Sequence, residues 1–206
     1  MVVARLGEGI KALARAWNVE VTDEVDARIA DFLCLLLKWN KVINLTGAGS
    51  FEDLAEEHLP DSLALCRFVP AGSRLVDIGS GGGLPALPFA ISRPDCTVTM
   101  VEPRGRRVAF LRTAVREIGG KNVEVVQGRL ECALGGGYDI AVSRATFPPE
   151  AWLEQAQGLV GGGGRVVAFG AGPLGPSSSW ALGDSVSYKT ARGVARWVGF
   201  FVPRGT

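Results

Sequence analysis

The segment Val76-Asp-Ile-Gly-Ser-Gly-Gly-Gly-Leu-Pro85 carries the strongest chemical signal in the chain. Its glycines at positions 79, 81 and 83 permit a tight turn, and they let the backbone approach a ligand where a Cβ atom would collide. The segment follows an expected strand over 74–78, and ligands of open α/β sheets bind outside the carboxyl ends of such strands. We therefore expect a ligand site here that includes Asp77, Gly79 and Gly81.

The spacing of the glycines indicates which ligand is bound. A dinucleotide fingerprint needs its third glycine at the position of Leu84, and no Gly-Lys-Ser/Thr follows to make a P-loop. Glu102 ends the next expected strand, where a carboxylate can accept hydrogen bonds from both hydroxyls of a ribose. An adenosine compound without an essential phosphate contact, such as S-adenosylmethionine, satisfies this pattern. The structural alternative for Glu102 is an exposed acid at a strand end.

Two later strand ends are expected at the same edge of the sheet. Gln127-Gly-Arg-Leu-Glu131 follows the third strand and could hold an adenine edge through backbone groups. Ser143-Arg-Ala145 follows the fourth and places Arg144 where a transferred methyl group must emerge. The alternative for Arg144 is an ion pair with a carboxylate such as Asp77 or Glu131. Because the segments share one edge, we favour the ligand-binding interpretation.

Alternating strand and helix patterns must position these residues. Strands are predicted over 74–78, 97–102, 123–127, 138–143 and 165–169, and helices over 87–92, 104–118 and 149–159. This alternation predicts right-handed βαβ units and a mostly parallel sheet. The last two runs, 185–190 and 195–202, are too close for a crossover helix and must pair as an antiparallel hairpin, which is typical of methyltransferase sheets. We expect loops at 161–164 and 170–179, where glycine, proline and serine gather.

The first 70 residues are expected to form a helical region packed on a sheet domain that spans 71–206. Apolar residues recur at helical spacing over 25–37 behind the helix-starting Thr22 and Asp23, and Ser50 begins a second, short helix. The intervening Trp39-Asn-Lys-Val-Ile-Asn-Leu-Thr46 is too polar for a core and too apolar for a free loop.

The composition excludes several classes of protein. With 206 residues, of which 47% are hydrophobic and 21% charged, the chain matches soluble globular proteins and not disordered ones. The apolar run 32–37 is too short to span a membrane, and charges near the N-terminus interrupt any signal-peptide core. The cysteines at 34, 66, 96 and 132 lie far apart beside a single histidine, so we expect buried reduced thiols in a cytoplasmic protein, with no metal site.

In order along the chain, these segments resemble the bacterial 16S rRNA guanine-N7 methyltransferase family (RsmG, also called GidB). The resemblance covers most of 38–145 and runs through Asn44-Leu-Thr46, His58-Leu-Pro-Asp-Ser-Leu63, the glycine loop, Arg106-Arg-Val-Ala-Phe-Leu111 and Ser143-Arg-Ala145. It implies a Rossmann-like class I S-adenosylmethionine-dependent methyltransferase fold. It also implies that the S-adenosylmethionine site is lined by Gly79, Leu84, Glu102, Leu130, Glu131 and Arg144. The family usually has Lys-Gly near the end of the fifth strand, where this chain reads Ala168-Phe-Gly-Ala-Gly172.

The substrate that the resemblance implies is a guanine in the decoding region of small-subunit RNA. Guanine N7 carries an in-plane lone pair and no proton, so its attack on a sulfonium methyl needs alignment and no general base. We expect Arg144 to be the catalytic residue, donating to guanine O6 as arginine does when it reads guanine in a groove. The resemblance also suggests that His58 and Asp61 border the substrate; the alternative for His58 is a satisfied, partly buried side chain.

Charge is distributed unevenly although the net charge is only +1. Residues 1–60 hold six basic and ten acidic side chains, whereas 155–206 hold five basic and one acidic. We expect Lys189 and Arg196, with Arg192, to contact RNA phosphates, and hairpin solvation is the alternative. Asn44, His58 and Arg129 complete the expected RNA-binding set; the alternatives are a structural pin for Asn44 and a solvated cap for Arg129.

The expected partner is 16S rRNA or the 30S subunit, bound by a monomer with neither metal nor membrane. Two alternatives stay open. The first is a methyltransferase of the same class that acts on a protein or a small molecule. The second is a non-catalytic nucleotide-binding module, which Leu84 and the terminal hairpin disfavour.

Overall fold

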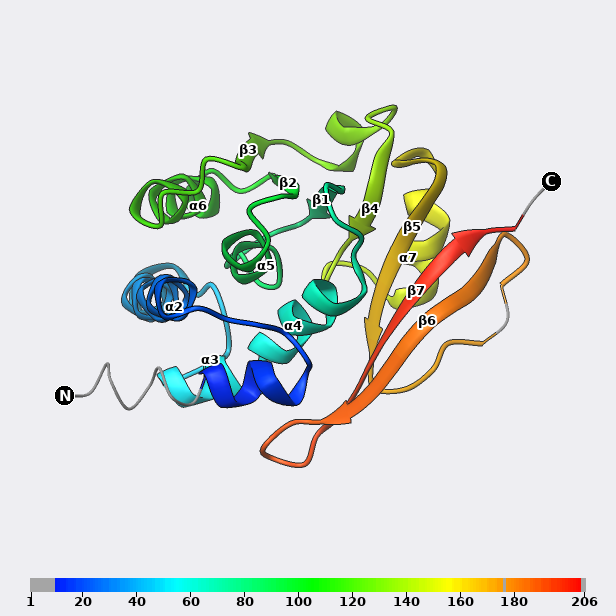
Figure 1. Ribbon diagram of the computed structural model, residues 1–206. Helices are drawn as coiled ribbons and strands as arrows, with labels where there is room; N and C mark the ends of the chain where they lie inside the picture. The colour runs from blue at the N-terminus through cyan, green and yellow to red at the C-terminus, as the bar shows by residue number, and fades with distance from the viewer. Residues whose placement is uncertain (1–9, 176, 205–206) are drawn as a thin grey trace.

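A seven-stranded sheet forms the centre of the computed structural model, which describes residues 10–175 and 177–204 (Figure 1). The strand order is β3-β2-β1-β4-β5-β7-β6. The strands are β1 (Arg74–Ile78), β2 (Thr97–Glu102), β3 (Val123–Gln127), β4 (Tyr138–Val142), β5 (Val160–Gly170), β6 (Trp180–Lys189) and β7 (Ala195–Pro203). The first five pair in parallel, and β7 runs antiparallel to both β5 and β6. The predicted parallel sheet with a terminal hairpin is confirmed.

Helices cover both faces of this sheet (Figure 1). One face carries α2 (Asp23–Ile43), α4 (Leu59–Phe68), α5 (Ala86–Ser92) and α6 (Gly105–Glu117), and the other carries α7 (Pro149–Gln155). Alternate residues of one strand serve the two layers: Val167 of β5 joins the larger core, and its neighbours Val166 and Ala168 join the core beneath α7. Nowhere in the described chain is a helix both long enough and apolar enough to cross a bilayer.

The N-terminal helices begin where the sequence predicts. Thr22 Oγ1 accepts a hydrogen bond from the Val25 nitrogen at the start of α2, and Ser50 Oγ accepts from the Asp53 nitrogen at the start of α3 (Phe51–Glu57). A further helix precedes them over 10–16. The apolar stripe of α2 packs against α5 and α6, so the helical region shares one core with the sheet.

One asparagine organises the loop that follows α2. Asn40 Oδ1 accepts hydrogen bonds from the backbone nitrogens of Leu45 (2.6 Å) and Thr46 (2.9 Å), and its Nδ2 donates to the Ala48 carbonyl (3.1 Å). Asn44 ends the helix in the left-handed region, with φ 49°. This wrapping explains why the segment is neither core nor free loop: Leu45 is buried and Trp39 and Ile43 pack against the core, Val42 is exposed, and the backbone is satisfied locally.

The structure differs from the prediction at the start of β5. Residues 161–164, expected as a loop, belong to the strand, which begins at Val160. A Cβ atom on Gly164 would lie 2.8 Å from the Tyr138 carbonyl and 2.7 Å from the Val160 Cβ. Close packing therefore requires glycine at 164, and Gly163, with φ +86°, shows that the backbone still turns within this irregular strand.

Two smaller expectations are also corrected. The predicted helix over 149–159 ends at Gln155 and continues as a 3₁₀ turn over Ala156–Gly158. All four cysteines are free thiols, but only Cys66 and Cys96 are buried, whereas Cys34 and Cys132 are exposed. The expectation of four buried thiols was therefore half wrong.

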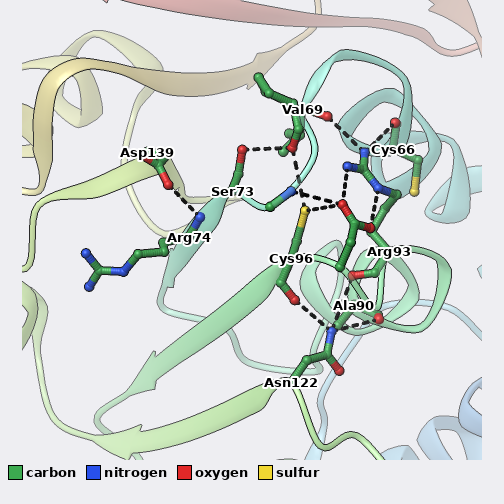
Figure 2. A network of polar contacts seen from close by, with 12 residues as sticks. Cys66, Val69, Ser73, Arg74, Ala90, Arg93, Cys96, Asn122 and Asp139 are labelled. Atoms are coloured by element: carbon green, nitrogen blue, oxygen red, sulfur yellow. Dashed lines mark hydrogen bonds and ion pairs between the residues drawn. The ribbon is translucent and has the colours of Figure 1, made fainter.

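A polar network joins the amino ends of the strands (Figure 2). The Arg93 guanidinium, just after α5, donates to the carbonyls of Cys66 (3.2 Å) and Val69 (2.8 Å) and pairs with Asp95 (2.8 Å). The Asn122 amide, just before β3, donates to carbonyls of Ala90, Arg93 and Cys96 at 3.0–3.4 Å. This end of the sheet is thus tied together, and the carboxyl ends of the strands remain for a site.

We expect Asn122→Ala to lower the free energy of unfolding by about 1–3 kcal/mol, because partly buried carbonyl oxygens lose their donor. Urea denaturation measures the change. Lys121→Ala is the matched control, since the neighbouring Lys121 side chain is exposed and its loss should change stability by less than about 0.5 kcal/mol. Equal effects of the two substitutions would contradict the structural role of Asn122.

Candidate active site

A cleft of about 680 Å³ opens where β1, β4 and β5 end. Seven of the residues predicted from the sequence line it: His58, Asp61, Gly79, Gly81, Leu84, Arg144 and Arg196. They come from the junction of α3 and α4, the loop after β1, the end of β4, and β7. The cleft therefore gathers parts of the chain that are distant in sequence.

Glycine stands at positions 79, 81 and 83 of the loop after β1 for different physical reasons. A Cβ atom on Gly79 (φ +76°) would lie 2.2 Å from Thr146 Oγ1, and one on Gly83 (φ +78°) would lie 2.6 Å from Leu87 Cδ1. Gly81 has room: the nearest atom to its added Cβ would be Arg107 Nη1 at 3.6 Å. Glycine at 79 and 83 is thus required by neighbouring side chains as well as by its backbone angle, whereas at Gly81 (φ +52°) the backbone angle alone favours glycine.

Two buried carboxyl groups lie under this loop. Glu102 is 2% exposed, and its Oε2 accepts from the Gly81 nitrogen (3.0 Å) while its Oε1 accepts from the Arg104 nitrogen (2.9 Å). Asp77 is 1% exposed, and its Oδ2 has no hydrogen-bond partner among the described residues. Burial raises the pKa of Asp77 to about 7. The predicted acid of β2 is therefore in contact with the glycine loop and is not the exposed strand-end acid of the alternative.

Arg144 is held by a partner that the sequence did not indicate. Its Nη1 donates to Asp61 Oδ2 at 2.9 Å, and the two side chains are 19% and 6% exposed. The carboxylates considered from the sequence, Asp77 and Glu131, are not its ion-pair partners. The reason is tertiary, because the first turn of α4 lies beside the end of β4. Asp61 thus anchors Arg144 at the cleft.

His58 is the second neighbour of Arg144, with its Nδ1 3.2 Å from Arg144 Nη1. A guanidinium can only donate, so Nδ1 accepts and the neutral ring carries its proton on Nε2. Burial, and then the charge of Arg144, lowers the pKa of His58 to about 4. His58 is therefore neutral near pH 7, and its basic nitrogen is occupied, so it cannot act as a base from Nδ1.

The remaining predicted residues lie outside this cleft. Leu130 and Glu131 belong to the 3₁₀ turn after β3, and Arg129 directly precedes it. Arg129 and Glu131 are exposed. Asn44 is exposed at the end of α2. Lys189 lines a different, largely apolar cavity of about 910 Å³, formed by the helix over 10–16, α3 and β6. We call this second space the apolar cavity.

Arg107 and Phe169 are among the lining residues of the cleft to which sequence reasoning assigned no role. Arg107 reaches it from the first turn of α6, and Phe169 reaches it from the end of β5. Both lie in segments that were singled out by motif, but the motif gave no direction for their side chains. In the described residues, no group of three or more His, Cys, Asp or Glu side chains could hold a metal ion.

Solved structures share this fold at low sequence identity. An S-adenosylmethionine-dependent methyltransferase from Aquifex aeolicus aligns with a TM-score of 0.55 and 15% identity, over 72% of this chain and 92% of that one. TrmN from Thermus thermophilus aligns with a TM-score of 0.55 and 20% identity, over 69% and 48% of the two chains. The fold is that of a Rossmann-like class I methyltransferase.

Curated relatives are more similar in sequence. A ribosomal RNA small subunit methyltransferase G from Azoarcus sp. is 39% identical over 166 residues, covering 80% of this chain and 76% of its own. The protein of the same name from Halorhodospira halophila is 38% identical over 150 residues, 71% of each chain. A family model described as rRNA small subunit methyltransferase G matches residues 26–172. The chain belongs to the rRNA small subunit methyltransferase G family.

Proposed function

We propose that this protein transfers the methyl group of S-adenosylmethionine to N7 of a guanine in 16S rRNA of the small ribosomal subunit. Family membership supports ribosomal RNA as the substrate. The observation that carries the proposal is the Arg144 guanidinium, anchored to Asp61 in a cleft beside the glycine loop. We further propose that the enzyme works as a monomer in the cytoplasm, where a ribosomal RNA substrate would be found.

The residues under the glycine loop fit the methyl donor. Gly81 lines the cleft without a side chain, and Glu102, which accepts from the Gly81 nitrogen, can also accept hydrogen bonds from ribose hydroxyls. The buried, unpartnered Oδ2 of Asp77 suits a ligand of positive charge. When bound, S-adenosylmethionine supplies an electrophilic methyl group on its sulfonium. Gly79, Leu84 and Arg144 complete the proposed contacts at the cleft, and Leu130 and Glu131 are proposed as outer contacts.

Arg144 is proposed to orient the guanine. Its Nη1 is used by Asp61 and His58, which leaves Nε and Nη2 free to donate to guanine O6. Since N7 has no proton to lose, catalysis depends on alignment in a site that excludes water. The neutral His58, with its Nδ1 occupied, agrees with a mechanism that uses no general base.

Other side chains are proposed to bind the RNA around the guanine. Phe169 offers an aromatic face at the cleft on which a base could stack. Arg107 and Arg196 line the same cleft, and neither forms an ion pair within the described residues, so both are available for phosphate groups. The more distant Lys189, Arg129 and Asn44, with His58 at the cleft, complete the proposed RNA-binding set.

The direct test is methyl transfer from labelled S-adenosylmethionine to 30S subunits and to free 16S rRNA, with the product mapped as N7-methylguanosine. We expect Arg144→Ala to lower the rate by about 100-fold or more, because the guanine loses its alignment. Calorimetry should show that this variant still binds S-adenosylmethionine. Full RNA methylation by Arg144→Ala would contradict the assigned role, and methylation of only a protein or small molecule would contradict the proposed substrate.

The low pKa of His58 predicts a pH effect on stability. The unfolded ring, with the ordinary histidine pKa of 6.5, takes up a proton more readily than the folded ring, with a pKa of about 4. The contribution of His58 to stability is therefore complete above pH 6.5 and is lost as the pH falls towards 4. Lowering the pH from 7.5 to 5 should therefore reduce the free energy of unfolding of the wild type by about 1–2 kcal/mol more than that of His58→Gln. Asp77 titrates in both proteins, so its opposite contribution cancels; a constant difference would contradict the low pKa.

The proposed phosphate contact of Arg107 predicts a change in salt dependence. RNA affinity should fall with rising salt, and Arg107→Gln should reduce the slope of log affinity against log salt by about one. Arg116→Gln, at the other end of α6, is the matched control because Arg116 is exposed and pairs with Glu117. Filter binding of the RNA at several salt concentrations measures both slopes, and an unchanged slope for Arg107→Gln would exclude this contact.

A further inference from the structure

The carboxylate that anchors Arg144 has a second partner from the C-terminal hairpin. Tyr188, on β6, donates its hydroxyl proton to Asp61 Oδ1 at 2.5 Å. The other oxygen of Asp61, Oδ2, accepts from Arg144 at 2.9 Å. Each oxygen of this buried carboxylate is therefore occupied by one donor, and the donors come from separate parts of the sheet, one from the end of β4 and one from β6.

The Tyr188 ring packs against an aromatic neighbour. The ring of Trp17 meets it edge-on, with 5.0 Å between ring centroids and an interplanar angle of 82°. On β7, Arg196 lies opposite Tyr188 in the backbone register of the hairpin. The Tyr188 ring lines the apolar cavity, whereas Asp61, to which its hydroxyl points, lines the cleft. The side chain thus bridges the two spaces without itself lining the cleft.

The Tyr188 hydroxyl keeps its proton and can therefore always donate a hydrogen bond to Asp61. Burial, followed by the charge of the Asp61 carboxylate, raises the pKa of Tyr188 above its usual value. The hydroxyl consequently stays protonated at any pH at which the enzyme would act. A charge-assisted hydrogen bond of this kind fixes the orientation of a carboxylate more firmly than a neutral one.

We propose that Tyr188 is a positioning residue for the methyl transfer, which acts through Asp61 to fix the Arg144 guanidinium in the cleft. The inference rests on the proposed function and extends it to a residue outside the range 26–172 that the family model matches. In this chain the C-terminal hairpin, through Tyr188, completes the active site.

The physical reason lies in what Asp61 would do without the hydroxyl. Oδ1 would be left without its donor in a side chain that is only 6% exposed, and such a group moves to find another partner. The carboxylate and the guanidinium it holds would then shift together. Because the reaction depends on alignment, a small displacement of Arg144 costs rate even though the cofactor contacts are unchanged.

Tyr188→Phe tests this, since it removes only the hydroxyl. We expect kcat for RNA methylation to fall by about 10- to 100-fold, while KM for S-adenosylmethionine stays within about twofold. Tyr138→Phe is the matched control: it removes the hydroxyl of the only other tyrosine, whose ring lies on β4 against Arg74. The control should keep the wild-type kcat. All rates are measured well below the melting temperature of each variant, so that a loss of stability alone leaves kcat unchanged.

A double-mutant cycle shows whether the effect passes through Asp61. Asp61→Asn should lower kcat, and Tyr188→Phe added to it should cause little further loss. Independent effects that add in the double variant would overturn the inference, and so would a wild-type kcat for Tyr188→Phe.

A third measurement does not depend on activity. The side-chain nitrogen resonances of Arg144, assigned with Arg144→Lys, should shift or broaden in Tyr188→Phe and stay in place in Tyr138→Phe. Unchanged resonances in Tyr188→Phe would overturn the inference. If the wild-type protein methylates neither 30S subunits nor 16S rRNA, the proposed function fails, and the resonances still decide whether Tyr188 positions Arg144.

Discussion

The ion pair between Asp61 and Arg144 is the interaction on which the candidate site depends. It joins α4 to the end of β4, and its carboxylate is almost fully removed from solvent. A buried ion pair of this kind is favourable only when the remaining donors and acceptors are also satisfied. Tyr188 satisfies the second carboxylate oxygen, and His58 accepts from the guanidinium. The pair therefore requires α4, β4 and the terminal hairpin to be in place together.

The two ends of the sheet have different roles, and the polar contacts explain how. At the amino ends, Arg93 and Asn122 bind carbonyl groups from successive segments and tie helix ends to strand starts (Figure 2). At the carboxyl ends, β1 and β4 lead into the glycine loop and Arg144, which line the cleft. A rigid base beneath a site of this kind keeps its groups in position, which is what a reaction governed by alignment needs.

Much of the fold could be predicted because it follows from local patterns. The β-branched runs located β1 to β4 closely, and Thr22 and Ser50 marked helix starts through their own side-chain chemistry. The start of β5 could not be predicted in this way. The glycine run 161–164 has the composition of a loop, yet it lies within β5, where Gly164 allows that strand to approach the Tyr138 carbonyl of β4 closely. A glycine that permits a turn and a glycine that permits close packing look identical in sequence.

The sequence by itself determined the parallel sheet, its antiparallel end, the glycine loop and the acid of β2 that contacts it, because strand alternation brings these carboxyl ends to one edge. Only the tertiary structure decided which carboxylate holds Arg144. Asp61 is 83 residues away from it, and Tyr188 is 127 residues away from Asp61. Periodicity and spacing describe which face of an element is apolar, but contacts between distant polar side chains depend on how the finished elements pack against one another.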